Sequence, residues 1–254
     1  MGRRVFDIGA AAVALIVLSP LMLLVAFAIR VSSAGPVIFH APRVGRHGRP
    51  FSMFKFRTMI VGAGALGSAI TGSHDPRVYP LGRLLRRSKI DELPQLFNVL
   101  RGEMAIVGPR PEDPRVVDNW YRPEDQLTLK VRPGLASPGS LYNFTHGEAQ
   151  LAGPDAQAMY IERVLPIKLA LDVVYVRRAS LGYDVQIVLR TVFVIAAAML
   201  GKRRFGEPPE MAEARKLAPQ LTWEPPPVDV SWERPQVQGS YPLTGEVDLK
   251  SSSA

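Results

Sequence analysis

The sequence predicts an α+β domain attached to a membrane through its N-terminal segment, and three observations support this fold class. No charged residue occurs from Ile8 to Ile29. Between residues 37 and 59, two short apolar runs flank a turn rich in Gly, Pro and Arg, a pattern typical of a β-hairpin. From Leu93 onward, apolar residues recur with helical spacing.

Composition narrows the classes of partner. The chain has 254 residues, of which 47% are hydrophobic, which is enough for a sizeable core. Its formal net charge of +8 favours an anionic partner, and nucleic acid, acidic lipid and phosphorylated substrates all remain open. The absence of cysteine excludes disulfides and thiolate chemistry, so any nucleophile must be oxygen or nitrogen.

The uncharged N-terminal segment has the length of a membrane helix. As a straight helix, residues 8–29 would extend about 33 Å, against a hydrocarbon core of about 30 Å. The run exceeds the roughly 7 to 15 apolar residues of a signal peptide, so cleavage is the least favoured of three interpretations. The other two are a helix that crosses the membrane and a helix that enters and returns to the same side.

Ser19 and Pro20 lie in the middle of this segment and predict a kink. Proline removes a backbone donor and clashes with the carbonyl four residues earlier, and the Ser19 hydroxyl can bond a freed carbonyl. Arg3, Arg4 and Arg30 place positive charge on both flanks, which suits re-entry better than crossing. An ordinary kinked spanning helix remains about equally favoured on these grounds.

Residues 37–39 and 51–59 are predicted as the strands of the hairpin, with a turn over 42–50. Alternation along the second strand puts Lys55 and Arg57 on one face and Phe54 and Phe56 on the other. Residues 62–72 are rich in Gly and small side chains and are interpreted as a loop.

Helices are predicted in three places after the hairpin. The first begins near Pro94 and stops by Gly102, which puts Asp91 and Glu92 at its N-terminal end. The others cover residues 168–178 and 183–200, and the second is interpreted as a core or an interfacial helix.

The chain changes character after Gly201. Eight prolines occur between residues 208 and 242, so residues 205–254 are interpreted as an extended tail without regular structure. Trp223, Trp232 and Tyr241 could bind it to a surface or to a second subunit, as in a homodimer. The predicted organisation is therefore a membrane helix over 1–34, a domain over 35–204 and a tail over 205–254.

Adjacent carboxylates at Asp91 and Glu92 are the strongest chemical feature of the sequence. They follow a basic cluster over 83–89, and carboxylate and phosphate oxygens are the ligands that Mg²⁺ prefers. Arg110 lies between Pro109 and Pro111, and a guanidinium in a restricted backbone suits bidentate phosphate binding. Spacing alone nevertheless favours a plain helix cap at Asp91 and an exposed loop residue at Arg110.

A family resemblance reverses that preference. The sequence resembles the bacterial sugar transferase family, the monotopic polyprenyl phosphate phosphoglycosyl transferases, in order from about residue 3 to residue 200. The matching segments are Gly35-Pro36-Val37-Ile38-Phe39, Arg43-Val44-Gly45, Lys55-Phe56-Arg57-Thr58-Met59, the run from Asp91 to Met104, Val107-Gly108-Pro109-Arg110-Pro111, Val131-Arg132-Pro133-Gly134, and the set Asp172, Tyr175, Ser180, Asp184, Leu189, Arg190 and Thr191.

The resemblance implies a two-step transfer at the cytoplasmic face of the bacterial inner membrane. The aspartate matching Asp91 attacks the β-phosphate of a UDP-sugar, expels UMP, and passes the sugar phosphate to polyprenyl phosphate. Mg²⁺ is expected on Asp91 and Glu92, with Glu92 in a helper role. Lys55, Arg57, Arg86, Arg110 and Asp184 are expected near the substrates.

The resemblance also implies a re-entrant helix hairpin broken at Ser19-Pro20. The full expected fold is then this hairpin, a small β-sheet and amphipathic interfacial helices that together form a membrane-associated catalytic domain. Anionic lipids are expected partners, and nucleic acid is not, because the chain contains no recognised nucleic-acid module.

One stretch departs from the family. Residues 135–140 read Leu-Ala-Ser-Pro-Gly-Ser where many members have a Thr-Gly-x-Ala-Gln-Val type of sequence. The departure leaves the identity of the sugar and nucleotide open. It also leaves an alternative from another class, a membrane-anchored scaffold that keeps the fold without the activity.

Overall fold

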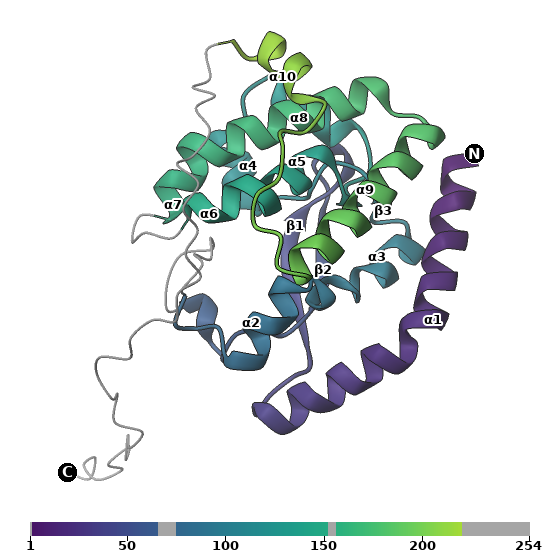
Figure 1. Cartoon of the computed structure of the whole chain (residues 1–254), viewed down its shortest axis with the longest axis vertical. Coiled ribbons are helices and arrows are strands. Elements are labelled where there is room, and N and C mark those ends of the chain that lie inside the picture. Colours follow the sequence, from purple (N-terminus) through teal and green to yellow (C-terminus); the bar gives the residue numbers. More distant parts are fainter. Residues whose placement is uncertain (1, 66–74, 152–155, 220–254) are drawn as a thin grey trace, which may run out of the picture.

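The computed structural model describes residues 2–65, 75–151 and 156–219 (Figure 1). Helices predominate in this part of the chain, and the strands are short. The elements in chain order are α1 Gly2–Ser32, β1 Ile38–Val44, β2 Pro50–Phe56, α2 Pro80–Arg87, α3 Gln95–Arg101, β3 Ala105–Val107, α4 Pro114–Trp120, β4 Gly134–Ala136, α5 Pro138–Tyr142, α6 Glu148–Gln150, α7 Ala156–Met159, α8 Leu165–Arg178, α9 Leu181–Met199 and α10 Met211–Leu217.

Helix α1 is continuous but bent, and Figure 1 shows its two arms meeting at an angle along the outside of the molecule. Pro20 lies inside the helix and cannot donate to the carbonyl of Ile16, four residues earlier. The Ser19 hydroxyl donates to that same carbonyl at 2.8 Å. The predicted rescue of a freed carbonyl by Ser19 is therefore confirmed.

Most of the apolar surface of α1 faces outward. Ile16, Leu23 and Phe27 each keep about 70% of their surface exposed. An exposed apolar surface of this kind marks contact with lipid or with another apolar surface. Both α1 and α9 are long and apolar enough to cross a membrane.

Both ends of α1 are bound to the rest of the molecule. Near the first end, Arg4 donates to the carbonyl of Val99 at 2.7 Å, and Arg3 forms an ion pair with Asp184 at 2.7 Å. At the other end, the Arg57 guanidinium donates to the carbonyls of Ser33, at 2.7 Å, and Ala34. The helix therefore begins and ends against the same folded body.

Strands β1 and β2 form the predicted antiparallel hairpin, with Ile38 opposite Phe56 and Val44 opposite Pro50. The first strand is longer than predicted and reaches Val44, whereas the second ends at Phe56, because Met59 instead bridges to Val78. Ala11, Met53, Leu96, Val99 and Met104 belong to one buried apolar cluster, in which α3 packs against both α1 and β2.

A second pairing positions the loop that carries Arg110. Strand β3 pairs in parallel with β4, with Ala105 opposite Gly134 and Val107 opposite Ala136. A Cβ atom at Gly108 would lie 2.4 Å from the carbonyl oxygen of Arg132, so only glycine allows the two backbones to approach this closely. The same crowding is seen from the other side at Gly134.

Helix α8 is the centre of the second half of the fold. Its buried residues enter three separate apolar clusters, in contact with α5, α10 and the segment that precedes it. The two long helices agree with the predicted ranges 168–178 and 183–200 within a few residues. Ser180 caps α9 by accepting a hydrogen bond from the backbone N–H of Tyr183.

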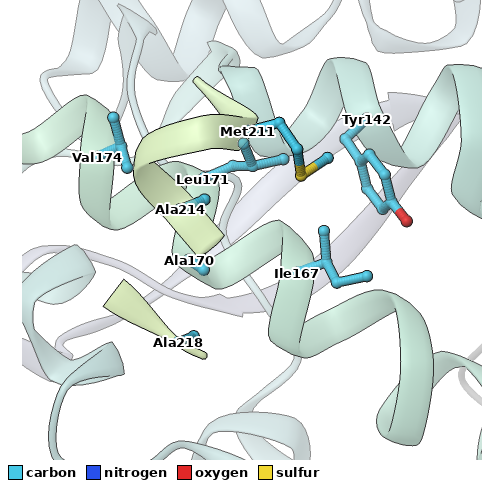
Figure 2. Close-up of a cluster of buried hydrophobic side chains, with 8 residues drawn as sticks. All are labelled: Tyr142, Ile167, Ala170, Leu171, Val174, Met211, Ala214 and Ala218. Atoms are coloured by element: carbon cyan, nitrogen blue, oxygen red, sulfur yellow. The ribbon is translucent and has the colours of Figure 1, made fainter. Parts of the chain in front are cut away.

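The interpretation of residues 205–254 as an extended tail is wrong for its first part. Residues 211–217 form α10, and Met211, Ala214 and Ala218 pack against Ile167 and Leu171 of α8 (Figure 2). The prolines at 208 and 209 precede this helix and do not interrupt it. Residues 220–254 and most of the predicted loop at 62–72 lie outside the described residues.

Candidate active site

Asp91 and Glu92 lie in a 3₁₀ turn, Ile90–Glu92, between α2 and α3. Lys89 enters this turn with a φ of 57°, a left-handed conformation that non-glycine residues seldom adopt. Such a conformation costs about 1 kcal/mol or more and is concentrated at functional sites. Pro94 precedes α3 and Gly102 ends it in the left-handed conformation, so the predicted helix boundaries are confirmed.

Glu92 is held by two cations. Its Oε1 atom lies 2.7 Å from the Arg110 guanidinium and 3.3 Å from the Lys55 ammonium. Burial alone would raise the pKa of Glu92, but Arg110, Lys55 and Lys89 together lower it well below its usual range. Glu92 is therefore a fixed anion whose Oε1 atom is engaged by two cations.

Asp91, the next residue, differs from Glu92 in both its hydrogen bonding and the direction of its pKa shift. Its side chain is buried, and its Oδ1 atom has no hydrogen-bond partner within the part of the chain that the structure describes. Burial raises the pKa of Asp91, with a further rise from Glu92 and opposition from Lys55, Lys89 and Arg86. A buried carboxylate oxygen with raised basicity and no partner is suited to act as a nucleophile or a ligand.

Further cations surround the pair. Arg86 on α2 donates to the Thr58 hydroxyl at 2.9 Å, and burial lowers the pKa of Arg86. The Lys89 ammonium lies 2.8 Å from Glu148 and 4.7 Å from the centre of the Phe144 ring. Burial opposes the charge of Lys89, but Glu148 and Glu92 raise its pKa. The setting favours a multiply charged anion.

Arg110 is oriented by contacts along its whole length. Its backbone N–H donates to Asp172 at 3.3 Å, and its Nη1 atom donates to the Gln95 side-chain oxygen at 3.1 Å. Its other terminal nitrogen pairs with Glu92. Arg110 is thus not an exposed loop residue, and the predicted association of Asp91, Glu92, Lys55, Arg86 and Arg110 in one region is what the structure contains.

Residues 135–140, the stretch that departs from the family pattern, are connected to the Arg110 loop through Asp172. Ser137 caps α5, and the backbone N–H of Gly139 donates to Asp172 at 3.0 Å. A Cβ atom at Gly139 would lie 2.4 Å from the carbonyl oxygen of Lys168, so the stretch is closely packed against α8. Asp172 is completely buried and joins this stretch to the Arg110 loop.

Two residues predicted to lie near the substrates, Asp184 and Arg57, make contacts with the two ends of the α1 segment. Asp184 accepts hydrogen bonds from Arg3 at 2.7 Å and from the Tyr175 hydroxyl at 2.8 Å, which links α9 to the start of α1. Arg57 holds the end of α1. A direct contact of either residue with substrate stays a prediction, whereas their observed contacts connect α1 to the rest of the fold.

Sequence reasoning assigned no role to Gln95 or Asp172, although both lie in matching segments. Gln95 follows Asp91 by four residues, a spacing that puts two side chains on one face of a helical turn. That spacing was the available signal for Gln95. Asp172 offers none, because its partners are 33 and 62 residues away along the chain.

Comparison with known proteins identifies one family of transferases. The family model described as bacterial sugar transferase matches residues 1–198. The chain is 40% identical over 193 residues to UDP-glucose:undecaprenyl-phosphate glucose-1-phosphate transferase of Caulobacter vibrioides, a match that covers 75% of this chain and 68% of that protein.

Two other relatives show a similar level of identity. Undecaprenyl-phosphate glucose phosphotransferase of Komagataeibacter xylinus is 39% identical over 191 residues, which are 75% of this chain and 35% of that protein. UDP-N-acetylgalactosamine-undecaprenyl-phosphate N-acetylgalactosaminephosphotransferase of Aeromonas hydrophila is 38% identical over 195 residues, which are 76% of this chain and 43% of that protein. The chain thus matches about a third to two thirds of the length of these relatives, and their names include more than one sugar.

Proposed function

The chain belongs to the bacterial sugar transferase family, and on that premise we propose that it moves a sugar 1-phosphate from a UDP-sugar to a polyprenyl phosphate and releases UMP. The names of three relatives describe transfer of this kind to undecaprenyl phosphate. The reaction would be the first membrane step in the synthesis of a bacterial glycoconjugate or exopolysaccharide.

One observation carries the proposal: two neighbouring carboxylates differ in their contacts, and their pKa values are shifted in opposite directions. Glu92 is engaged by Arg110 and Lys55, whereas Asp91 is buried, has a raised pKa, and has an oxygen without a partner among the described residues. The more basic and less engaged carboxylate is the better nucleophile. Asp91 is therefore the residue to which we assign covalent catalysis, and Glu92 the neighbour that holds the cations in place.

The proposed reaction has two displacements at one phosphorus atom. An Asp91 oxygen bonds to the β-phosphorus as the bond from that phosphorus to the bridging oxygen breaks, and UMP leaves with the electron pair. An oxygen of the polyprenyl phosphate then bonds to the same phosphorus as the bond to Asp91 breaks. The product is a polyprenyl diphosphosugar, and the Asp91 carboxylate is restored.

Partly buried cations reduce the main obstacle to this chemistry, which is repulsion between a carboxylate and an anionic substrate. Lys55, Arg86, Lys89 and Arg110 all act on the charge of Asp91 or Glu92. Arranged before the substrate arrives, such charges stabilise the negative charge that develops on the transferring phosphoryl group. Positioning and charge are the main contributions a protein makes to phosphoryl transfer.

The residues present fit a Mg²⁺ ion held jointly with substrate. The described residues contain no group of three His, Asp or Glu side chains that could hold a metal, so a site built from protein ligands alone is not found there. Mg²⁺ commonly binds one or two carboxylates and completes its shell with phosphates and water, and the unpartnered oxygen of Asp91 suits this role. Asp91 and Glu92 would hold the ion, which would neutralise charge on the donor phosphates.

We place the enzyme at the cytoplasmic face of the bacterial inner membrane, with α1 entering and leaving on one side. Two features support this arrangement: α1 bends at Ser19 and Pro20, and both of its ends are bound to the same folded body. An enzyme held in one leaflet meets a lipid phosphate at the interface and a nucleotide sugar from the cytoplasm. Arginines near both ends suit anionic headgroups on that side.

The direct test is UMP release. Purified full-length protein in detergent with Mg²⁺, polyprenyl phosphate and a panel of UDP-sugars that includes UDP-glucose and UDP-N-acetylgalactosamine should release UMP and label the lipid. A folded preparation that transfers from no donor in a broad panel would contradict the proposal. That result would favour the alternative, a membrane-anchored scaffold of the same fold. The arrangement of Asp91 and Glu92 with Arg110 counts against this alternative.

A second test concerns the covalent step. With UDP-sugar and without lipid acceptor, intact-protein mass spectrometry should detect the mass of one phosphosugar on the wild-type chain and none on Asp91→Asn. Asp118→Asn is the matched control, because Asp118 is an exposed carboxylate on α4. An adduct that survives in Asp91→Asn would assign the nucleophile to another residue.

A further inference from the structure

Gln95 presents an unusual buried side chain next to the proposed nucleophile. It is the first residue of α3 and is fully buried. Its Oε1 atom accepts a hydrogen bond from Arg110 Nη1 at 3.1 Å. A guanidinium can only donate, so the oxygen of the carboxamide must face Arg110 and the NH₂ group must point away from it.

That NH₂ group has no acceptor in the part of the chain that the structure describes. Gln95 Nε2 is buried and without a hydrogen-bond partner among residues 2–65, 75–151 and 156–219. Buried donors are almost always paired in folded proteins, and an exception indicates a functional site or a missing partner. By contrast, the Asn98 amide one turn further along α3 donates to Ser52 at 2.8 Å and to Glu103 at 2.7 Å.

The position of Gln95 indicates what the missing partner is. Leu93 and Pro94 are helical, so Asp91 and Gln95 lie about one turn apart on the same side of the chain. Asp91 Oδ1 is a second buried atom without a partner in the described structure. Lys55, Arg86 and Arg110 make the surroundings positive, so an anionic oxygen is the acceptor that the site favours.

We propose that the Gln95 carboxamide donates a hydrogen bond to a nonbridging oxygen of the phosphoryl group that Asp91 attacks. Its oxygen stays on Arg110, which holds Glu92, so one planar amide connects the transferring phosphoryl group to the helper carboxylate. Gln95 is thus a catalytic residue that acts on the β-phosphate of the donor. This inference rests on the proposed function.

The test compares UDP, which carries a β-phosphate, with UMP, which does not. In Gln95→Glu the oxygen that faces Arg110 is kept, and the NH₂ donor is replaced by an anionic oxygen that repels phosphate. Isothermal titration with full-length protein in detergent and Mg²⁺ should show UDP binding weakened by about tenfold or more, because a hydrogen bond to a charged group is lost and repulsion is added. UMP binding should change by less than about twofold, which also shows that the nucleotide site is folded.

Gln95→Met separates loss of the donor from added repulsion. Methionine has a similar shape and neither donor nor acceptor, so UDP binding should weaken less than in Gln95→Glu while UMP binding is kept. Asn98→Asp is the matched control on the same helix, since it makes the same change to a buried amide that is already paired. It should lower thermal stability without a selective loss of UDP.

Two results would overturn the inference: UDP binding unchanged in both Gln95 variants, or UDP and UMP weakened equally. Failure of the proposed function would look different, because the wild-type chain would then release no UMP from any donor. The contrast between UDP and UMP is measured by binding alone. It therefore reports on Gln95 whether or not transfer is observed.

Discussion

At the scale of one residue, Arg110 connects two side chains of the site through the two terminal nitrogens of its guanidinium. Its guanidinium reaches Glu92 with one nitrogen, at 2.7 Å, and Gln95 with the other, at 3.1 Å. In Arg110→Lys the ammonium is a compact charge without the planar fork that reaches both partners, so at least one of these contacts should be lost. A hydrogen bond to a charged group contributes roughly 1.5–3 kcal/mol, so kcat/KM for UMP release should fall by about 10- to 100-fold.

Arg132→Lys is the control for that change. Arg132 is a partly buried arginine that donates to the carbonyl of Gly102 at the other end of α3. Its replacement should leave kcat/KM within about twofold of wild type. Equal losses in the two variants would mean that Arg110 contributes only to folding.

Asp172 predicts a pH dependence of stability. Burial raises its pKa to about 6, although Lys168, Ser137 and backbone N–H groups oppose the rise. The folded state therefore holds the proton more tightly than the unfolded state, and stability falls as the pH rises from about 4 to about 6. A shift of about two pKa units corresponds to roughly 3 kcal/mol.

Asp172→Asn should remove this component. Urea unfolding in detergent at pH 4, 5, 6 and 7 should show the wild type losing stability relative to the variant across that window, whatever the constant offset between the two. Parallel profiles would contradict the assignment of the titration to Asp172.

The residues of the site could be predicted where they stand in short continuous segments of the sequence. Asp91, Glu92 and Arg110 stand in short segments that resemble the family, and this resemblance identified them although their spacing alone favours a helix cap and an exposed loop residue. The contacts of Arg57 and Asp184 were not predictable, because Asp184 pairs with Arg3, 181 residues away, and Arg57 bonds carbonyl groups, which leave no mark in a sequence. Burial raises the pKa of both Asp91 and Glu92, and ion pairs with Arg110 and Lys55 make the difference between them. These pairs depend on tertiary structure.

At the scale of elements, the bend in α1 is the feature to test. In a Ser19→Ala, Pro20→Leu variant the backbone N–H at position 20 is restored and can bond the carbonyl of Ile16, so the helix should straighten. The chain has no cysteine, and single cysteines at positions 2 and 33 therefore report their side of the membrane. Both should be labelled from one side in wild type, and a large fraction should be split between two sides in the variant.

Pro36→Ala is the matched loss of proline outside α1 and should leave the labelling unchanged. Labelling of positions 2 and 33 from opposite sides in the wild-type chain would instead identify α1 as a spanning helix.

Helix α10 makes a second prediction at this scale. Met211 is buried against α8 (Figure 2). Glu210 accepts hydrogen bonds from Arg190 at 2.9 Å and from Tyr183 at 2.6 Å. Met211→Ala should destabilise the protein by about 2–5 kcal/mol, measured by thermal unfolding in detergent. Lys216→Ala on the exposed side of the same helix should change stability by less than about 0.5 kcal/mol.

The elements differ in how far the sequence predicts them. The hairpin and α3 follow from strand alternation and from proline and glycine at helix ends, which are local rules. Helix α10 escaped prediction because proline density around it outweighed a short helical segment whose stability comes from packing on α8. It also lies beyond residue 198, where the match to the family model ends.

At the scale of the whole molecule, exposed apolar surface on α9 predicts contact with lipid. Leu189, Val192 and Phe193 are each more than 60% exposed on this helix. An environment-sensitive fluorophore on Leu189→Cys should shift to the blue when detergent is replaced by vesicles that contain anionic lipid. The same fluorophore on Lys216→Cys of α10 should not shift, and equal shifts at both positions would contradict a defined membrane face.

Lys55 and Arg57 stand two residues apart at the end of one strand, and this spacing has a consequence for substrate choice. Lys55 pairs with Glu92, and Arg57 donates to the carbonyls of Ser33 and Ala34, which follow α1. In the proposed membrane arrangement, these contacts link the position of Asp91 and Glu92 to the end of α1, and through it to the bilayer surface. We expect the acceptor to be selected by the depth at which its phosphate rests, and prenyl chains of very different length to serve equally well.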